Sequence, residues 1–414
     1  MTKRFTPASV INLVRNIPTG QAIWVAWIFL LPCNPANAIE PNVFTWGNID
    51  LAPTLRSEIT FDDNIYRQGS NEVDSVVGTI TPSVVAGYTD EVNSYQLELE
   101  GTRGLYSATS EDDYTAWSLA ADAHVEVTQR HLLDFNFAYE DAIQPRGSGF
   151  SQFGFLPDEP DEFTAQDTGV TYQFGANDSL ARLVLEVNHR DREFTNNSRF
   201  IVGRDYQRTG WRGSFLYNVL PRTDILFEVR GADFDYDDNF QSGAQQFAQL
   251  DSEEVYVFIG ATWEATARTT GSVRIGRADK DFKSPQRRDI DEPSYEIGLQ
   301  YAPLTYSIFG FSANQNFEEG IGIGSALKRR SVQLDWRHEW SERLFSEVTV
   351  SVQDDDYVGS TLTDSFDRYS ASINYAFQRW LDIRVGFQVE NRDSNAAQFN
   401  ADRTGLIVGF EASF

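Results

Sequence analysis

The chain has 414 residues, and its 61 acidic against 34 basic side chains give a formal net charge of −27. This balance argues against a nucleic-acid-binding protein, because phosphates require a basic protein face. Phe and Tyr number 30 and 17, whereas long runs of helix-forming residues with helical spacing are missing, so the expected class is all-β.

An export signal is predicted at the N-terminus. Lys3 and Arg4 begin a basic segment, and an apolar run follows at residues 22–33. The run is shorter than the roughly 20 residues that a membrane-spanning helix needs. The sequence ANA then ends at Ala38 and fits a small-x-small cleavage site. We therefore expect cleavage after Ala38.

Two alternatives to cleavage at this site stay open. The apolar run could remain as an uncleaved anchor, or Cys33 could be a lipoprotein acylation site, although Pro32 stands where such signals need a small flexible residue. Cys33 is the only cysteine, so removal of a signal peptide at 1–38 leaves a domain at 39–414 without disulfide, thiol nucleophile or cysteine-bound metal. Such an exported, acidic chain is typical of the outer membrane of a Gram-negative bacterium.

The rest of the chain alternates apolar and polar residues with period two, which predicts β-strands with one polar face. In LLDFNFAYE, residues 132–140, Phe135 lies on one side and Asp134 on the other. We predict about eighteen strands, or sixteen if the weakest segments, 291–302 and 305–315, are not strands. The predicted strands lie near residues 49–61, 75–88, 93–106, 114–127, 131–140, 163–175, 180–191, 205–218, 223–234, 251–264, 268–279, 291–302, 305–315, 327–339, 343–354, 365–377, 381–391 and 403–414.

Short turns and long loops alternate between these strands. Short connections such as 128–131 and 220–223 carry turn-forming residues, whereas long ones lie at 140–163, 191–205 and 233–251. This alternation is typical of an antiparallel outer-membrane β-barrel with short periplasmic turns and long outer loops. An even number of strands then places both termini in the periplasm. The alternative is a soluble β-sandwich or β-solenoid.

The polar strand faces are expected to line an aqueous lumen, because sixteen to eighteen strands enclose a channel. An acidic excess there would favour cations or weakly charged solutes, whereas the alternative is a bracing network of cross-strand ion pairs. Little chain separates the cleavage site from the first strand, so we expect no plug domain, and loop 140–163 is the candidate for narrowing the pore. The candidate lumen-lining residues are Glu98, Glu100, Asp122, Asp134, Glu186, Arg212, Asp224, Glu228, Arg230, Arg274, Asp335, Arg337, Arg368, Asp382, Arg384 and Glu411.

Signals for catalysis or cofactors are weak. His124 lies between Asp122 and Glu126 on one strand face, as an acid–base cluster or simply as part of the lumen wall. GIGIG at 320–324 lacks the Lys-Ser/Thr of a phosphate-binding loop, and DFDYDD at 233–238 lacks the Gly and distant Glu of a calcium loop. We expect no catalytic site, cofactor or metal.

The segment LAPTLRSEITFDDNIYR, Leu51 to Arg67, resembles the first strand of an outer-membrane β-barrel porin family. Members open with a Pro-containing strand that runs into an aromatic-Asp-Asp-Asn segment, which begins here at Phe61. Architecture and terminal Phe agree over essentially the whole mature chain. The resemblance implies the barrel component of capsule or exopolysaccharide export, paired with a periplasmic polysaccharide export protein, and it implies no catalytic residues.

The chain ends in TGLIVGFEASF, whose apolar residues alternate up to Phe414. We expect this strand to close the barrel against the first strand, which removes both edges. Phe414 resembles the signal that the barrel assembly machinery reads in outer-membrane proteins. Outer-membrane lipid and lipopolysaccharide would then surround the barrel.

The strand pattern therefore predicts an outer-membrane channel, and the resemblance implies that this channel is an exopolysaccharide exporter that conducts passively. The first alternative is a diffusion porin, general or selective, for small hydrophilic solutes. An outer-membrane hydrolase and a structural barrel without a pore are further alternatives. Enzymes at this location commonly use narrower barrels, and His is scarce, with four residues in the chain.

Overall fold

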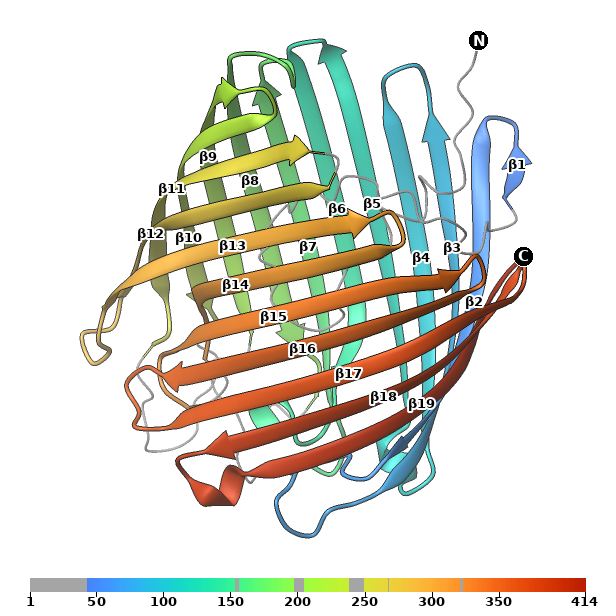
Figure 1. The fold of residues 1–414 in the computed structure, drawn as a ribbon. Helices are drawn as coiled ribbons and strands as arrows, with labels where there is room; N and C mark the ends of the chain where they lie inside the picture. Colours follow the sequence, from blue (N-terminus) through green and yellow to red (C-terminus); the bar gives the residue numbers. More distant parts are fainter. Residues whose placement is uncertain (1–42, 153–155, 197–204, 238–248, 267, 321–322) are drawn as a thin grey trace.

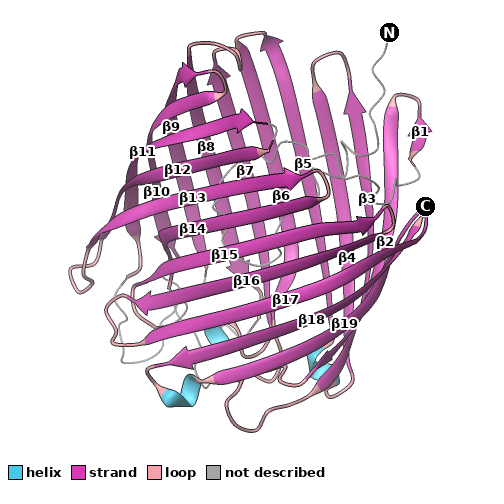
Figure 2. Cartoon of the chain, viewed as in Figure 1, coloured by secondary structure: helices cyan, strands magenta, loops and turns pink. Residues whose placement is uncertain are grey.

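The computed structural model describes residues 43–414, apart from 153–155, 197–204, 238–248, 267 and 321–322. The predicted signal peptide lies outside this part. Antiparallel strands and their connections make up almost all of it (Figures 1 and 2). Three short 3₁₀ turns occur in the connections, namely η1 Ser110–Asp112, η2 Gly149–Ser151 and η3 Ala397–Phe399. In the described part, no helix has the length and hydropathy to cross a bilayer.

All eighteen predicted strands are confirmed, including the two with the weakest alternation, and one short strand, β1, was not predicted. The strands are β1 Phe44–Trp46, β2 Ile49–Asp62, β3 Ser75–Thr89, β4 Ser94–Tyr106, β5 Tyr114–Thr128, β6 His131–Gln144, β7 Asp161–Phe174, β8 Ala181–Phe194, β9 Tyr206–Leu220, β10 Thr223–Tyr236, β11 Ser252–Thr266, β12 Thr269–Phe282, β13 Ile290–Leu304, β14 Ser307–Glu319, β15 Ala326–Ser341, β16 Leu344–Tyr357, β17 Thr363–Gln378, β18 Leu381–Ser394 and β19 Ala401–Ser413.

Strands β2 to β19 form one closed sheet, in which each strand pairs with its neighbour in the chain and β19 pairs with β2. The closing ladder runs from Gly405 opposite Asp62 to Ser413 opposite Thr54. The predicted closure of the barrel is thus confirmed. Strand β1 pairs with Ile49–Leu51 on the same edge of β2, beyond the end of β19 (Figure 1). A soluble sandwich of two sheets is excluded by this single continuous ladder.

The connections separate into a short-turn end and a long-loop end of the barrel. The predicted long loops are shorter in the structure, because their flanking strands continue further. Strand β6 extends to Gln144, β8 to Phe194 and β10 to Tyr236. Strand β1 and the last residue of β19 both lie at the short-turn end (Figure 1).

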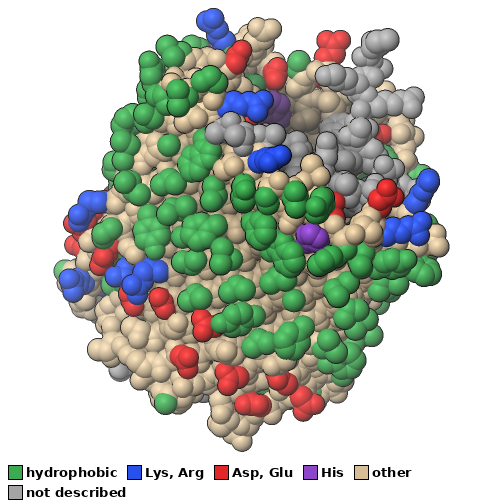
Figure 3. Space-filling view, in the orientation of Figure 1, with side chains coloured by type: hydrophobic (Ala, Val, Ile, Leu, Met, Phe, Trp, Pro, Cys, Tyr) green, Lys and Arg blue, Asp and Glu red, His purple; other side chains and the backbone are tan. Residues whose placement is uncertain are grey.

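The outer face of the barrel carries an apolar belt. On β11, Val255, Val257 and Ile259 are exposed and alternate with the buried Tyr256 and Phe258. Hydrophobic side chains cover the middle of this face, and charged side chains gather toward its edges (Figure 3). An exposed apolar surface of this extent suits lipid rather than water.

Candidate functional site: the barrel lumen

Two cavities occupy the interior of the barrel. The one toward the long-loop end has a volume of about 1420 Å³ and the one toward the short-turn end about 1440 Å³. Gln333, Glu347 and Arg384 border both cavities. The two cavities are therefore adjacent and together occupy the lumen of the barrel.

The predicted lumen residues lie on the inner strand faces. Twelve of the sixteen border a cavity, namely Glu100, Asp134, Arg212, Asp224, Glu228, Arg274, Asp335, Arg337, Arg368, Asp382, Arg384 and Glu411. The other four, Glu98, Asp122, Glu186 and Arg230, each lie two residues along a strand from a cavity-lining residue and share its face. Their part in solute passage stays a prediction.

Charges on the inner wall of β9–β13 form a cross-strand network. Arg230 Nη2 lies 2.5 Å from Glu296 Oε1, and Arg274 Nη1 lies 3.0 Å from Glu296 Oε2. Glu228 lies 3.6 Å from Arg230 and accepts a hydrogen bond from Ser214 Oγ at 2.9 Å. Glu296 pairs with guanidinium groups on β10 and β12, and Glu228 pairs with Arg230 on its own strand and with Arg274 on β12, so this part of the wall is the bracing network.

The histidine singled out in the sequence gains a different partner. His124 Nδ1 lies 2.6 Å from Asp134 Oδ1 on β6, and His124 Nε2 lies 3.9 Å from Glu126 Oε1. Across the described residues, no three His, Cys, Asp or Glu side chains group as metal ligands. His124 borders the cavity at the short-turn end as part of the wall.

The first part of the β6–β7 loop enters the lumen, as predicted for loop 140–163, whose residues 153–155 lie outside the described part. Its residues 145–152, here called the crossing segment, include Gly147, Phe150 and Gln152, which border the loop-end cavity. Arg392 Nη1 on β18 donates to the carbonyl oxygen of Gln152 at 3.4 Å. Five strands, β19 and β2–β5, separate β18 from β6 around the wall, so the segment reaches β18 across the lumen.

An ion pair and a close backbone contact hold the crossing segment. Arg146 Nη2 lies 2.6 Å from Asp112 Oδ2, and the hydroxyl of Tyr66 donates to the same oxygen at 2.8 Å. Gly147 has φ +77°, and a Cβ there would lie 1.8 Å from the carbonyl oxygen of Tyr66. Burial and the hydrogen bond to Asp112 raise the pKa of Tyr66 to about 12. Tyr66 is therefore neutral at physiological pH and remains a donor.

A second element, not predicted, narrows the lumen from the opposite wall. The ladder between β13 and β14 stops at Tyr295 opposite Gln315, although both strands continue toward the long-loop end. On β15, the side chains of Leu327 and Arg329 border the loop-end cavity. Because side chains alternate along a strand, those of Ala326 and Lys328 lie on the opposite face of β15, away from this cavity. Residues 316–320 and 323–328, here together called the inner hairpin, turn this other face toward the inner wall of β11–β13.

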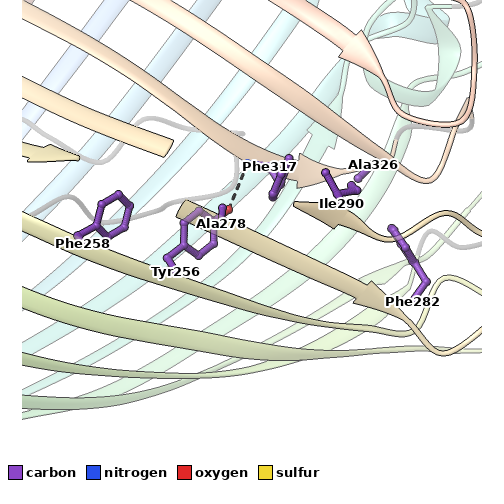
Figure 4. Close-up of a cluster of buried hydrophobic side chains, with 7 residues drawn as sticks. All are labelled: Tyr256, Phe258, Ala278, Phe282, Ile290, Phe317 and Ala326. Carbon is purple, nitrogen blue, oxygen red and sulfur yellow. Dashed lines mark hydrogen bonds between the residues drawn. The ribbon is translucent and has the colours of Figure 1, made fainter. Parts of the chain in front are cut away.

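Apolar contacts seal the inner hairpin against that wall. The N–H of Phe317 donates to the hydroxyl of Tyr256 at 3.2 Å, and Phe317 is 2% exposed. Phe317 and Ala326 of the hairpin share one buried cluster with residues of β11–β13 (Figure 4). Burying a Phe side chain contributes about 1.5–3 kcal/mol. The full cluster is Tyr256, Phe258, Ala278, Phe282, Ile290, Phe317 and Ala326.

Buried charges add to this contact. Lys280 on β12 is fully buried, and its Nζ lies 2.6 Å from Glu319 Oε1 and 3.5 Å from Glu254 Oε2. The hydroxyl of Tyr236 donates to Glu319 Oε2, and Lys328 Nζ lies 3.4 Å from Glu292 Oε1. The inner hairpin is therefore fixed by both apolar and ionic contacts.

The chain is similar to known proteins in sequence and in fold. A sequence model of the family described as "Putative beta-barrel porin 2" matches residues 38–414. OccK9 (OpdG) of Pseudomonas aeruginosa superimposes with a TM-score of 0.50 at 10% identity, over 87% of this chain and 98% of that chain. OpdK of the same organism, solved with vanillate, gives 0.49 at 12% identity over 89% and 99%. The siderophore receptor PirA from Acinetobacter baumannii gives 0.45 at 8% identity over 88% and 80%. No curated protein matches the chain in sequence.

Proposed function

The chain belongs to the β-barrel porin family whose sequence model spans residues 38–414, and from this premise we propose that it is a passive diffusion channel for small hydrophilic solutes. The family and the closed barrel make it an outer-membrane porin. The finer assignment, diffusion of small solutes, depends on the shape and chemistry of the lumen.

The observation that carries the proposal is a polar lumen narrowed from two sides. The crossing segment and the inner hairpin both border the loop-end cavity and are held by buried contacts. A wall of ionised side chains replaces the hydration of a polar solute as it passes. Fixed obstacles within such a wall favour compact solutes over a polymer chain.

The exopolysaccharide exporter gains no support from the lumen described above, and the diffusion porin is the better account. The periplasmic position of both termini, the role of Phe414 in assembly and the predicted partners stay predictions. These partners are lipopolysaccharide, the barrel assembly machinery and a periplasmic polysaccharide export protein. The N–H of Phe414 donates to the carbonyl oxygen of Pro53 at 3.1 Å, which continues the ladder between β19 and β2.

Purified protein in liposomes tests the proposal. Swelling rates with uncharged sugars of increasing size should be fast for a monosaccharide and fall steeply for a tetrasaccharide. Planar-bilayer recording should show steady ohmic current in KCl. Impermeability to every sugar and ion would contradict a diffusion channel. A gene deletion that abolishes surface polysaccharide would favour the exporter instead.

A further inference from the structure

The turn after β2 aims one arginine into the lumen. Asn64 is fully buried, and its Nδ2 donates to the carbonyl oxygens of Gln68 and Asp402, both at 2.7 Å. The N–H of Gln68 donates back to Asn64 Oδ1 at 3.0 Å. This clamp holds Arg67 at φ +51°, a left-handed conformation that costs free energy for a residue with a Cβ. The strained turn points the Arg67 side chain at β18.

Arg67 joins two further arginines around two carboxylates. Arg67 Nε donates to Glu390 Oε1 at 3.0 Å, and Arg368 Nε donates to Glu390 Oε2 at 2.7 Å. Arg403 Nε and Nη2 donate to Asp62 Oδ2 at 2.8 and 2.5 Å. Three guanidinium charges against two carboxylate charges leave a net charge of +1 in this cluster.

Several donors of this cluster face the loop-end cavity. Arg67, Arg368 and Arg403 all border that cavity, and their side chains are 26%, 34% and 20% exposed. Over the described ranges, both terminal nitrogens of Arg67, Nη2 of Arg368 and Nη1 of Arg403 have no hydrogen-bond partner. Guanidinium groups carry five N–H donors in a planar fork, so these nitrogens are available to an oxyanion.

We propose that Arg67, Arg368 and Arg403 form an oxyanion-recognition site in the narrowed part of the lumen, which takes the carboxylate or phosphate group of a small solute. The site rests on the proposed diffusion function, which brings solutes past it. It lies beside the crossing segment, because Tyr66 next to Arg67 binds Arg146 of that segment at 2.5 Å. A passing oxyanion would receive charge-assisted hydrogen bonds from two or three guanidinium groups.

The electrostatics of the cluster agree with this geometry. Burial, and the neighbouring positive charge of Arg403, lower the pKa of Arg67 below its ordinary value. Glu390 opposes this effect and does not cancel it. A bound anion would relieve the repulsion between the two guanidinium groups. The strongly acidic composition of the chain therefore does not set the sign of the charge at this point of the lumen.

Titration calorimetry on the purified, detergent-solubilised protein tests the site. The probes are succinate, inorganic phosphate and, as a neutral reference, glucose. Succinate or phosphate should bind. The anion that binds more tightly shows whether the site recognises a carboxylate or a phosphate group. Arg67→Gln and Arg368→Gln should each weaken binding by about tenfold, because a charge-assisted hydrogen bond is lost. Glu390→Gln should strengthen binding, because it removes a competing negative charge.

The control is Arg277→Gln, which removes the same charge from the outer face, where Arg277 pairs with Asp291. Its oxyanion affinity should equal that of the unaltered protein. The inference is overturned if neither anion binds, or if Arg67→Gln and Arg368→Gln bind as the unaltered protein does. Bilayer conductance separates the two proposals. Binding without conductance would overturn the diffusion channel alone, and conductance without binding would overturn the site alone.

Discussion

Arg146 binds both carboxylate oxygens of Asp112, with Nε 2.6 Å from Oδ1 and Nη2 2.6 Å from Oδ2. The pair joins the crossing segment to the β4–β5 loop, and its side chains are only 10% and 5% exposed. Removing one partner of a shielded pair costs about 3–5 kcal/mol. Arg146→Ala should therefore release the segment and raise single-channel conductance. Unchanged conductance would show that the segment does not limit the current.

Gly147→Ala tests the same segment by sterics alone. The added Cβ would lie 1.8 Å from the carbonyl oxygen of Tyr66, and φ +77° is strained for Ala, so the segment must move. We expect larger conductance with an unchanged unfolding midpoint of the barrel. The matched control is Gly87→Ala, where a Cβ meets nothing within 4 Å. Equal conductance in the two variants would count against the close packing of the segment.

The pH dependence of conductance should reveal the hydroxyl of Tyr66. Burial and then Asp112 raise its pKa from 10.0 to about 12. Because the pKa of Tyr66 is higher in the folded than in the unfolded state, its protonated hydroxyl stabilises the folded contact with the crossing segment. This stabilisation is complete below pH 10.0 and is lost as the pH rises through about 12. Conductance should stay constant up to pH 10.0 and should increase between pH 10.0 and about pH 12. Tyr66→Phe should abolish this step, and its persistence there would assign the step to another group.

The strands could be predicted because a bilayer imposes one rule on them. Lipid requires an apolar outer face and water a polar inner one, so period two appears in the sequence of every spanning segment. The rule does not hold beyond the bilayer, where both faces of a strand contact water. Asp233 lies within β10 on the outer face, and Arg277 and Asp291 pair on the outer face of β12 and β13. The predicted strands at 223–234 and 268–279 accordingly stop before β10 and β12, which continue to Tyr236 and Phe282.

The two elements that narrow the lumen differ in how far the sequence reveals them. Loop 140–163 is conspicuous by its length, but its contacts with Tyr66 and Arg392 join residues far apart in the chain. The inner hairpin is hidden, because Phe317 and Ala326 occupy positions that normally face lipid. The sequence signal for the inner hairpin is the pair of charged residues Glu319 and Lys328 on that same face. Charged side chains at positions that normally face lipid require ionic partners, and these partners lie on β12 and β13.

Lys280 on β12 should be the most sensitive of the residues that hold the inner hairpin. Lys280→Met leaves Glu254 and Glu319 without their buried cation, which costs about 3–5 kcal/mol. The free energy of unfolding in guanidinium, followed by Trp fluorescence, should fall by this amount. Lys283→Met is the control, because Lys283 lies 3.7 Å from Asp233 in an exposed pair that contributes about 0–1 kcal/mol. Combining Lys280→Met with Glu254→Gln and Glu319→Gln should restore much of the loss.

Ile259→Arg tests which face of the wall meets lipid. Ile259 lies at the middle of β11, is 49% exposed and belongs to the apolar belt. A charge at the bilayer midplane costs about 2–4 kcal/mol, because the guanidinium cannot reach water. Folding into phospholipid vesicles should become weaker by this amount. Gln333→Arg places the same side chain on the inner wall, where Gln333 borders both cavities, and should fold almost normally. Equal losses in the two variants would mean that lipid does not contact this face.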